Sequence, residues 1–435
     1  MQISEFREFE PGVFAMVREV LLDSRPHRSK PDSDVQTILH ALIENKLPAN
    51  PEKFTDTLNL LHVAANLQRF FVIRPPEAPG LYFCGGGLAH GSTSISVGGM
   101  GLSFATAFRR CLGEAAEYLA QIHNAESPAL QAIPLHQVQP AWPNYWLNFI
   151  NDPAAKTLDC IEARQLADGT AVFIPADLCI RRPDSQLTVP FKLSSGCAAG
   201  ITPDEALAKS IAEVIERDAV ALWWYGGTPA RRFSPKQLEA LGIASLLETC
   251  RGPYQGRQSN FLAILPACGV SSVFAYSFDK SGKHFACGMA THWDTRKALA
   301  SALLELCQME LGLALVHLKI EQQGIDSLNE GDKRQLQRST IKPDCNAFLA
   351  DPITSINLPE IKPDRLAGEL IDQLSKANLS AYYVDMSKPS LAVPATKVII
   401  PDLQAATPII LTNRLEAAIK KYGGGWGMRN KIGIY

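Results

Sequence analysis

Two pairs of glutamates have the spacing that brings carboxylates together on one face of a helix. Glu114 is followed three residues later by Glu117, and Glu213 is followed in the same way by Glu216. Residues three apart on a helix are neighbours, and two carboxylates about 4 Å apart repel each other by roughly 4 kcal/mol at an effective dielectric near 20. Each pair therefore needs either a cation or free contact with water.

The residue types favour a particular cation. Oxygen ligands without histidine or cysteine beside them suit hard Mg²⁺ better than zinc, and Mg²⁺ in proteins is usually held by a few carboxylates together with substrate phosphates. The pattern therefore indicates a magnesium site with a nucleoside triphosphate as its companion ligand. For a single isolated pair, a solvated helix face would be the simpler interpretation, because charged side chains are mostly exposed.

The same construction surrounds both pairs, which favours the metal site. Gly101-Leu102-Ser103 precedes the first pair and Gly200-Ile201-Thr202 precedes the second, at equal spacing to the glutamates. Serine and threonine are favoured at helix N-caps, so we expect a helix to begin after each. A third alanine-rich copy, residues 298–308, ends in Gln308 where the second glutamate would stand. Three matched helices predict a repeated structural unit whose copies line one site.

Three stretches of the sequence resemble signatures of a known family. Residues 194–224, SSGCAAGITPDEALAKSIAEVIERDAVALWW, resemble the central signature of the YcaO superfamily. Residues 98–120, GGMGLSFATAFRRCLGEAAEYLA, resemble its preceding glycine-rich turn and ExxE helix. Residues 389–404, PSLAVPATKVIIPDLQ, resemble its late strand, and the resemblance as a whole extends from about Gly85 to the C-terminus.

The resemblance implies an ATP- and Mg²⁺-dependent enzyme of ribosomal peptide maturation, similar to the azoline cyclodehydratases. Such an enzyme phosphorylates a peptide amide oxygen, so that Cys, Ser or Thr side chains of a precursor peptide close azoline rings. A thioamide- or amidine-forming enzyme and a catalytically weak scaffold subunit are the alternatives. The resemblance assigns Mg²⁺ to Glu114, Glu117, Glu213 and Glu216, and ATP to Ser103, Ser195, Glu205, Arg217 and Gln308. It identifies no catalytic residue.

Two features depart from the family pattern. Relatives commonly carry an arginine shortly after the glutamine of the third helix, but none follows Gln308 closely, so Arg296 or Arg414 would have to supply that contact. Many ring-forming relatives end in a proline-rich PxPxP tail, whereas this sequence ends in Gly-Ile-Tyr. These departures keep the alternatives to azoline formation open.

Composition narrows the class of protein. The 435 residues carry a formal charge of −2 and are 46% apolar, which offers no basic surface for nucleic acid or an anionic membrane. The N-terminus lacks an export signal, and no uninterrupted apolar stretch reaches membrane-spanning length. Ten cysteines occur without a Cys-x-x-Cys pair, so neither a zinc knuckle nor a redox motif is indicated. We therefore expect a soluble, cytoplasmic protein without nucleic-acid or membrane partners.

The expected fold class is α+β: a YcaO-type domain over residues 81–435 with internally repeated sheet-plus-helix units, preceded by a small, mainly helical region over residues 1–80. In that first region, residues 35–43 and 54–67 have the apolar period of amphipathic helices, and residues 70–74 have a strand pattern. The region is interpreted either as a winged-helix-like docking module or as a layer packed on the main domain.

Several later segments predict strands and core. Residues 171–175, 379–384 and 395–400 have strand patterns, and residues 261–290 predict antiparallel hairpins. Trp223-Trp224-Tyr225 is predicted to lie in the core, with a stacking platform for adenine as the alternative.

The resemblance also implies partners. Because a leader-binding domain of the size fused to some relatives is not recognisable, we expect the precursor peptide to be presented by a separate leader-peptide-binding, E1-like partner protein. A flavin dehydrogenase is a further candidate partner, and we expect a homodimer within a larger complex.

Overall fold

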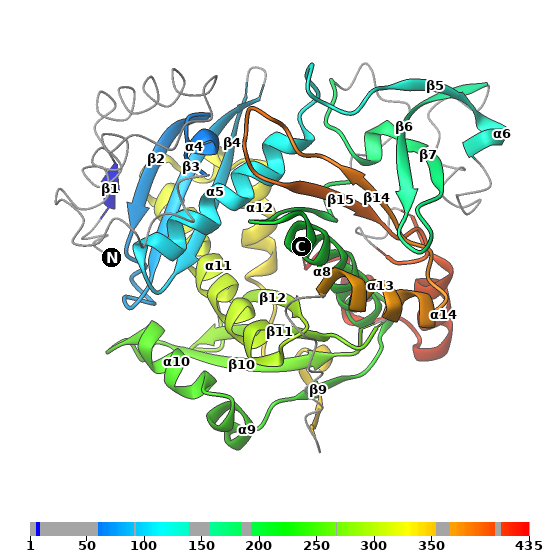
Figure 1. The fold of residues 1–435 in the computed structure, drawn as a ribbon. Helices are drawn as coiled ribbons and strands as arrows, with labels where there is room; N and C mark the ends of the chain where they lie inside the picture. The colour runs from blue at the N-terminus through cyan, green and yellow to red at the C-terminus, as the bar shows by residue number, and fades with distance from the viewer. Residues whose placement is uncertain are drawn as a thin grey trace.

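The computed structural model of this chain describes residues 6–8, 60–90, 93–138, 156–183, 193–266, 268–353, 366–404 and 410–434. Three β-sheets with helices between them make up this part of the chain (Figure 1). The mixed architecture confirms the predicted α+β class. The helix expected over residues 35–43 lies outside the described residues, as does the first part of the helix expected over residues 54–67.

The first sheet is built from consecutive antiparallel strands. Its order is β1 (Phe6–Glu8), β2 (Leu67–Ile73), β3 (Tyr82–His90) and β4 (Thr93–Gly101). The strand predicted at residues 70–74 is therefore β2, and it pairs directly with β3. The boundary predicted between residues 80 and 81 falls in the connection between these two neighbouring strands of one sheet.

The other two sheets gather strands from distant parts of the chain. One has the order β5 (Gln131–Pro134), β6 (Thr157–Gln165), β14 (Tyr382–Asp385), β15 (Ala395–Ile399) and β8 (Cys197–Ala199), with β7 (Ala171–Pro175) also paired to β6. The other has the order β12 (Ala286–His292), β11 (Ser271–Asp279), β10 (Arg257–Ile264), β9 (Ala230–Arg232) and β13 (Asp351–Pro352). The predicted strands at 171–175, 379–384 and 395–400 and the hairpins over 261–290 are confirmed.

In each sheet, one edge strand is followed in the sequence by a long helix. Strand β4 leads into α5 (Phe104–Gln121), β8 into α8 (Pro203–Ala221) and β12 into α11 (Thr295–Gln323). All three helices begin at a capping side chain whose oxygen accepts backbone N–H groups of the first turn. The caps are Ser103, Thr202 and Asp294. The repeated sheet-plus-helix unit that the sequence predicts is thus present three times.

The three units close on one another in a ring. Helix α5 packs on its own strand β4 and also contacts β8 of the second unit. Helix α8 contacts β12 of the third unit, and α11 contacts β4 of the first. Figure 1 shows α5, α8 and α11 as the three long helices between the sheets. The helix faces turned towards neighbouring units therefore converge in the middle of the molecule.

The remaining helices lie around this centre. They are α4 (Leu61–Ala64), α6 (Leu135–Val138), α9 (Pro235–Ala240), α10 (Ile243–Arg251), α12 (Glu330–Arg338), α13 (Leu366–Lys376), α14 (Asn413–Tyr422) and α15 (Trp426–Asn430). A turn of π-helix, Leu222–Gly226, continues α8. It contains Trp223 and Trp224, which are 3% and 0% exposed and pack against Phe274 and Trp426. The predicted core role of these tryptophans is confirmed.

Within the described residues, α11 alone has the length and apolar composition of a membrane-crossing helix, with a mean hydropathy of 1.6 over 18 residues. The helix carries three glutamates, Glu305, Glu310 and Glu321. Its buried face packs against β11, β12 and α10. Burial within the protein accounts for its apolar composition. All ten cysteines lie in the described ranges, are buried and form no disulfide.

Close contact between strand and helix leads to a testable prediction. A Cβ added to Gly288 of β12 would lie 2.2 Å from the Leu306 nitrogen and 2.5 Å from the Ala302 oxygen of α11. Because both atoms belong to the helix backbone, Gly288→Ala must push α11 away from its sheet. We expect a loss of about 1–3 kcal/mol in the free energy of unfolding, measured by urea denaturation.

Gly368→Ala is the matched control for this substitution. Gly368 lies in α13, and a Cβ there would meet nothing within 4 Å. Because alanine is favoured over glycine inside a helix, this variant should gain about 0.5–1 kcal/mol. Equal stability of the two variants would show that β12 and α11 do not pack as closely as described.

Candidate active site

The first glutamate of each unit is held by the backbone of its own sheet. The Glu114 carboxylate accepts a hydrogen bond from the Gly98 N–H at 2.6 Å. Glu213 accepts one from the Gly196 N–H at 3.0 Å. In the third unit, Glu305 accepts one from the Met289 N–H, also at 3.0 Å. Each carboxylate is thus held by a backbone donor that lies in its edge strand or directly before it.

The second glutamate reaches across to the next unit. Glu117 of α5 accepts a hydrogen bond from the Ala199 N–H of β8 at 3.1 Å, and Glu216 of α8 accepts one from the Thr291 N–H of β12. These bonds join neighbouring units, so the acidic side chains are part of the ring that closes the fold. Gln308 of α11 occupies the corresponding place in the third unit, one turn beyond Glu305.

The glutamates of the three helices influence one another electrostatically. Burial, and then the charge of Glu213, raise the pKa of Glu117 to about 8. Burial raises the pKa of Glu114 to about 7, and the Glu305 charge adds to this. Burial also raises the pKa values of Glu216 and Glu305, and the Glu213 carboxylate raises both further. The sequence expectation that the three helices line one site agrees with this mutual influence.

Arg217 lies inside this acidic cluster. Its guanidinium is 3.5 Å from the Glu213 carboxylate and 3.8 Å from that of Glu216. Its positive charge lowers the pKa of Glu216 and of Glu305, opposing the effect of burial. Arg217 therefore supplies part of the positive charge that offsets the carboxylates, which a metal ion would otherwise have to supply.

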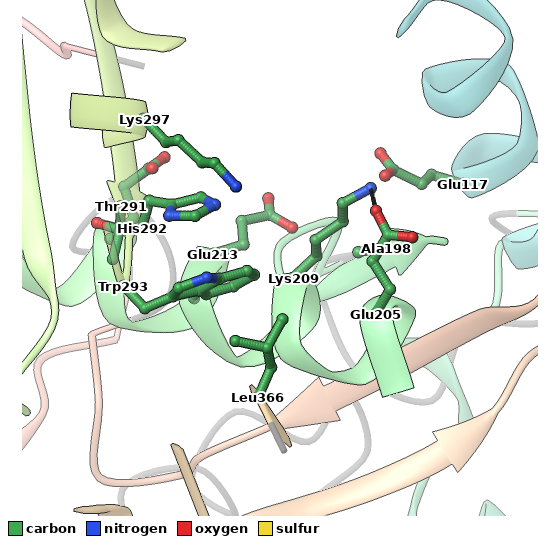
Figure 2. Close-up of a pocket in the computed structure, with 12 residues that line it drawn as sticks. Glu117, Ala198, Glu205, Lys209, Glu213, Thr291, His292, Trp293, Lys297 and Leu366 are labelled. Carbon is green, nitrogen blue, oxygen red and sulfur yellow. Dashed lines mark ion pairs between the residues drawn. The ribbon is translucent and has the colours of Figure 1, made fainter. Parts of the chain in front are cut away.

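A cavity of about 470 Å³ lies beside the cluster. It is lined by Glu117, Ala198, Glu205, Lys209, Ala212, Glu213, Glu216, Thr291, His292, Trp293, Lys297 and Leu366. Figure 2 shows that Glu117 and Glu213 point into it from α5 and α8 and that Lys297 points into it from the start of α11. Acidic and basic groups both line the cavity, with Lys209 paired to Glu205 and Glu216 bound to the Thr291 N–H.

Lys209 lies between the carboxylates of Glu205 and Glu117 (Figure 2). Its amino group forms an ion pair with Glu205 at 2.7 Å, drawn as the dashed line in Figure 2, and its charge lowers the pKa of Glu117. Both Glu205 and Lys209 also line a smaller adjoining cavity of about 140 Å³, whose other lining residues include Arg109 and the small residues Gly113 and Gly200. A ligand extended from the acidic cluster into this side cavity would pass this ion pair.

Four of the nine predicted site residues line the cavity, whereas Ser103, Ser195, Arg217, Gln308 and Glu114 do not. Glu117, Glu205, Glu213 and Glu216 line it. Ser103 caps α5 through a bond from the Thr106 N–H, and the Ser195 carbonyl accepts a hydrogen bond from the buried Lys397. Arg414, considered as a substitute arginine, is bound instead to the buried Asp218 at 2.9 Å.

Several site residues were not predicted. Glu305 was left out of the metal set, although it matches Glu213 in the third copy and its cap, Asp294, precedes it by the same 11 residues that separate Thr202 from Glu213. Lys209, His292 and Lys297 were not predicted either, because nothing in their spacing marks them.

The chemistry of the site fits a metal-bound polyphosphate. Glu117, Glu213 and Glu216 are half-buried and lie close to one another, and a bound cation would supply positive charge that offsets their repulsion. Among the residues that the structure describes, no group of three or more His, Cys, Asp or Glu side chains is arranged to hold a metal ion by itself. Mg²⁺ commonly completes its coordination with phosphate oxygens and water, so it needs few ligands from the protein.

The ring of three edge-strand and helix units around an acidic centre therefore defines a protein suited to binding a metal–nucleotide complex. The profile of one family, described as YcaO cyclodehydratase, ATP- and Mg²⁺-binding, matches residues 98–404. Because this match covers most of the sequence, the chain belongs to the YcaO family, whose members bind ATP and Mg²⁺.

Individual relatives are distant. An uncharacterized protein of Methanothermobacter thermautotrophicus is 25% identical over 265 residues, which cover 57% of this chain and 66% of that protein. A heterocyclase in complex with substrate and cofactor has a TM-score of 0.67 at 19% identity, covering 81% of this chain and 52% of the heterocyclase. The chain thus spans about half the length of that heterocyclase.

Two further solved structures share the fold. YcaO from Methanopyrus kandleri bound with AMPPCP and Mg²⁺ has a TM-score of 0.57 at 19% identity, covering 77% of this chain and 85% of that one. The Escherichia coli microcin synthetase McbBCD complex with pro-MccB17 bound also has a TM-score of 0.57, at 15% identity, with coverages of 77% and 88%. At these identities the likeness establishes the fold.

The raised pKa of Glu117 predicts how stability depends on pH. In the unfolded chain this carboxyl has its ordinary pKa of 4.5, whereas in the folded protein the pKa is about 8. Between these values the folded state binds more protons, so the free energy of unfolding must fall as pH rises from 5 to 8. Glu117→Gln removes this contribution, and its melting temperature, measured with EDTA present, should fall less steeply over that range.

Glu321→Gln serves as the control, because Glu321 is exposed at the far end of α11. Its melting curve should follow that of the natural sequence at every pH. If Glu117→Gln showed the same slope as this control, the carboxylate would not carry the predicted raised pKa.

Proposed function

We propose that this chain is a cyclodehydratase that activates peptide amide bonds of a ribosomally synthesised precursor peptide. A Cys, Ser or Thr side chain would attack the amide carbonyl, the resulting oxyanion would take the γ-phosphoryl group of ATP, and loss of phosphate would leave the azoline ring. The proposal rests on family membership and, in this structure, on one observation: glutamates from three helices converge beside a cavity large enough for a ligand.

Specific residues have specific tasks in this proposal. Glu117, Glu213 and Glu216 would hold Mg²⁺, with Glu114 at the rim of the acidic cluster and Arg217 limiting the repulsion among the carboxylates. Bound ATP would supply the phosphoryl group, and Mg²⁺ would screen the charge of its phosphates. Catalysis of phosphoryl transfer depends mainly on positioning and charge neutralisation, and the bonds from strand backbone to carboxylate fix these side chains in advance.

Two lysines in the cavity complement the acidic cluster. Lys209 lies between Glu205 and Glu117, and Lys297 lies across the cavity from Glu213. The ammonium groups of Lys209 and Lys297 could form ion pairs with phosphate groups bound in the cavity. Lys209 could then exchange its ion pair with Glu205 for one with the polyphosphate when the polyphosphate enters.

Partners belong to the proposal as well. The microcin synthetase relative is a complex with its precursor bound. By analogy, we propose that a separate leader-binding protein presents the precursor peptide to this chain, and that a flavin dehydrogenase can act on the product.

Loss of the acidic ligands should abolish nucleotide binding that depends on Mg²⁺. Glu213→Gln and Glu216→Gln each remove a charge from the cluster while keeping the size of the side chain. By calorimetry with AMPPCP and Mg²⁺, we expect at least a tenfold weaker affinity for each, a loss of about 1.4 kcal/mol or more in binding free energy. Glu321→Gln should bind like the natural sequence, and unchanged affinity in both cluster variants would refute the site.

The reaction itself is tested by mass spectrometry of the modified precursor. With ATP, Mg²⁺, the precursor and its presenting partner, we expect the peptide to lose one water for each ring. Replacement of oxygen by sulfur would indicate thioamide formation instead. ATP consumption without any mass change, unaffected by Glu213→Gln, would contradict peptide activation by this chain.

A further inference from the structure

His292 occupies a position that is unlike its counterparts in the other two units. It lies at the end of β12, two residues before the cap Asp294. The residues two positions before the caps Ser103 and Thr202 are Gly101 and Gly200. Of the three equivalent turns, the third alone therefore presents a side chain at this point.

The two glycines explain why this difference matters. A Cβ at Gly101 would lie 2.7 Å from the Ala107 nitrogen, and one at Gly200 would lie 2.5 Å from the Ala206 nitrogen. The helix backbone leaves no room for a side chain in those two units. At position 292 the connection is open enough for an imidazole, which lines the main cavity.

Neighbouring groups fix the ring and its proton. The Nδ1 atom accepts a hydrogen bond from the Asp294 N–H at 2.9 Å, so it carries no hydrogen. The ring lies against Trp293, with 3.9 Å between ring centroids. Burial, and then the charge of Lys297, lower the pKa of His292 to about 4. At neutral pH the imidazole is therefore uncharged and carries its one proton on Nε2.

The free edge of the ring lies in the cavity. Figure 2 shows His292 and Lys297 side by side, directed towards Glu213. A neutral N–H is a suitable donor for an uncharged amide oxygen, and an adjacent ammonium group stabilises negative charge that develops on that oxygen. His292 and Lys297 can both donate to an amide oxygen on this wall of the cavity, which also carries the Glu216 carboxylate bound to the Thr291 N–H.

We infer that His292 is a catalytic residue whose Nε2–H donates a hydrogen bond to the substrate amide oxygen during nucleophilic attack. The inference rests on the proposed function and adds the part of the site that receives the peptide. The metal and nucleotide are held on the side of Glu117 and Glu213, and the reacting amide is held on the side of the third unit.

Two amide substitutions separate donation into the cavity from support of the turn. Asn at position 292 can still accept the Asp294 N–H but does not reach the cavity, whereas Gln can place an N–H near the Nε2 position without accepting that bond. The probe is N-acetyl-glycyl-cysteine N-methylamide, titrated by NMR into protein already saturated with Mg²⁺ and AMPPCP. His292→Asn and His292→Phe should bind this probe about three- to tenfold more weakly, and His292→Gln should bind it nearly as well as the natural sequence.

Nitrogen-15 spectra of the histidine rings provide a second readout on the unaltered protein. We expect a neutral ring protonated at Nε2 whose resonance moves when the capped peptide is added, and does not move when Mg²⁺ and AMPPCP are added alone. His136→Asn, at an exposed position on α6, is the control substitution and should leave affinity unchanged.

Three outcomes would overturn the inference: a His292 resonance that does not respond to the peptide, one that responds to Mg²⁺ and AMPPCP alone, or binding restored by Asn and not by Gln. The proposed function fails by a different measurement, namely AMPPCP affinity that is insensitive to Glu213→Gln. The two failures are therefore distinguishable.

Discussion

Repulsion among carboxylates at the centre of the fold is the constraint on which the rest of this structure depends. Five glutamates from three helices meet there, and burial together with the charges of neighbouring carboxylates raises the pKa values of Glu114, Glu117, Glu216 and Glu305. Such a cluster is tolerated because backbone N–H groups in or beside the edge strands stabilise each carboxylate. The three sheets can be understood as supports that present those donors. Each helix register is fixed by a cap 11 residues before its first glutamate.

Buried cations strengthen this support from behind. Lys397 of β15 is fully buried, and its amino group donates to the carbonyls of Leu193 and Ser195. These carbonyls flank the turn whose Gly196 N–H binds Glu213. Burial lowers the pKa of Lys397, and the nearby Glu213 carboxylate opposes that effect, so the amino group both holds the turn and interacts with the acidic cluster. Lys388 acts similarly at the end of α5, where it donates to the Leu119 and Ile122 carbonyls.

The helices of the site could be predicted from local sequence patterns. The pairing of strands within the sheets could not, because the paired segments are far apart in the sequence. The caps, the alanine-rich faces and the glutamate spacing are all encoded within about twenty residues, so α5 and α8 and their carboxylates could be predicted. Strand β8 could not be placed in this way, because Ala199 pairs with Ala395 nearly two hundred residues later. His292 was missed for a related reason: its significance appears only when its turn is compared with Gly101 and Gly200 in the folded ring.

The three units are alike in backbone and unequal in chemistry, and this inequality gives the site its direction. The first two units contribute a complete pair of glutamates, while the third has Gln308 in place of the second. The third unit also contributes His292 and Lys297 to the cavity wall. An exactly threefold acidic ring would bind cations equally on every side and would leave no place for an uncharged amide. In the proposed reaction, this difference between the units would let a metal-bound polyphosphate and a peptide bond meet in one cavity, because the third unit places neutral and basic groups there and contributes Glu305 to the acidic cluster.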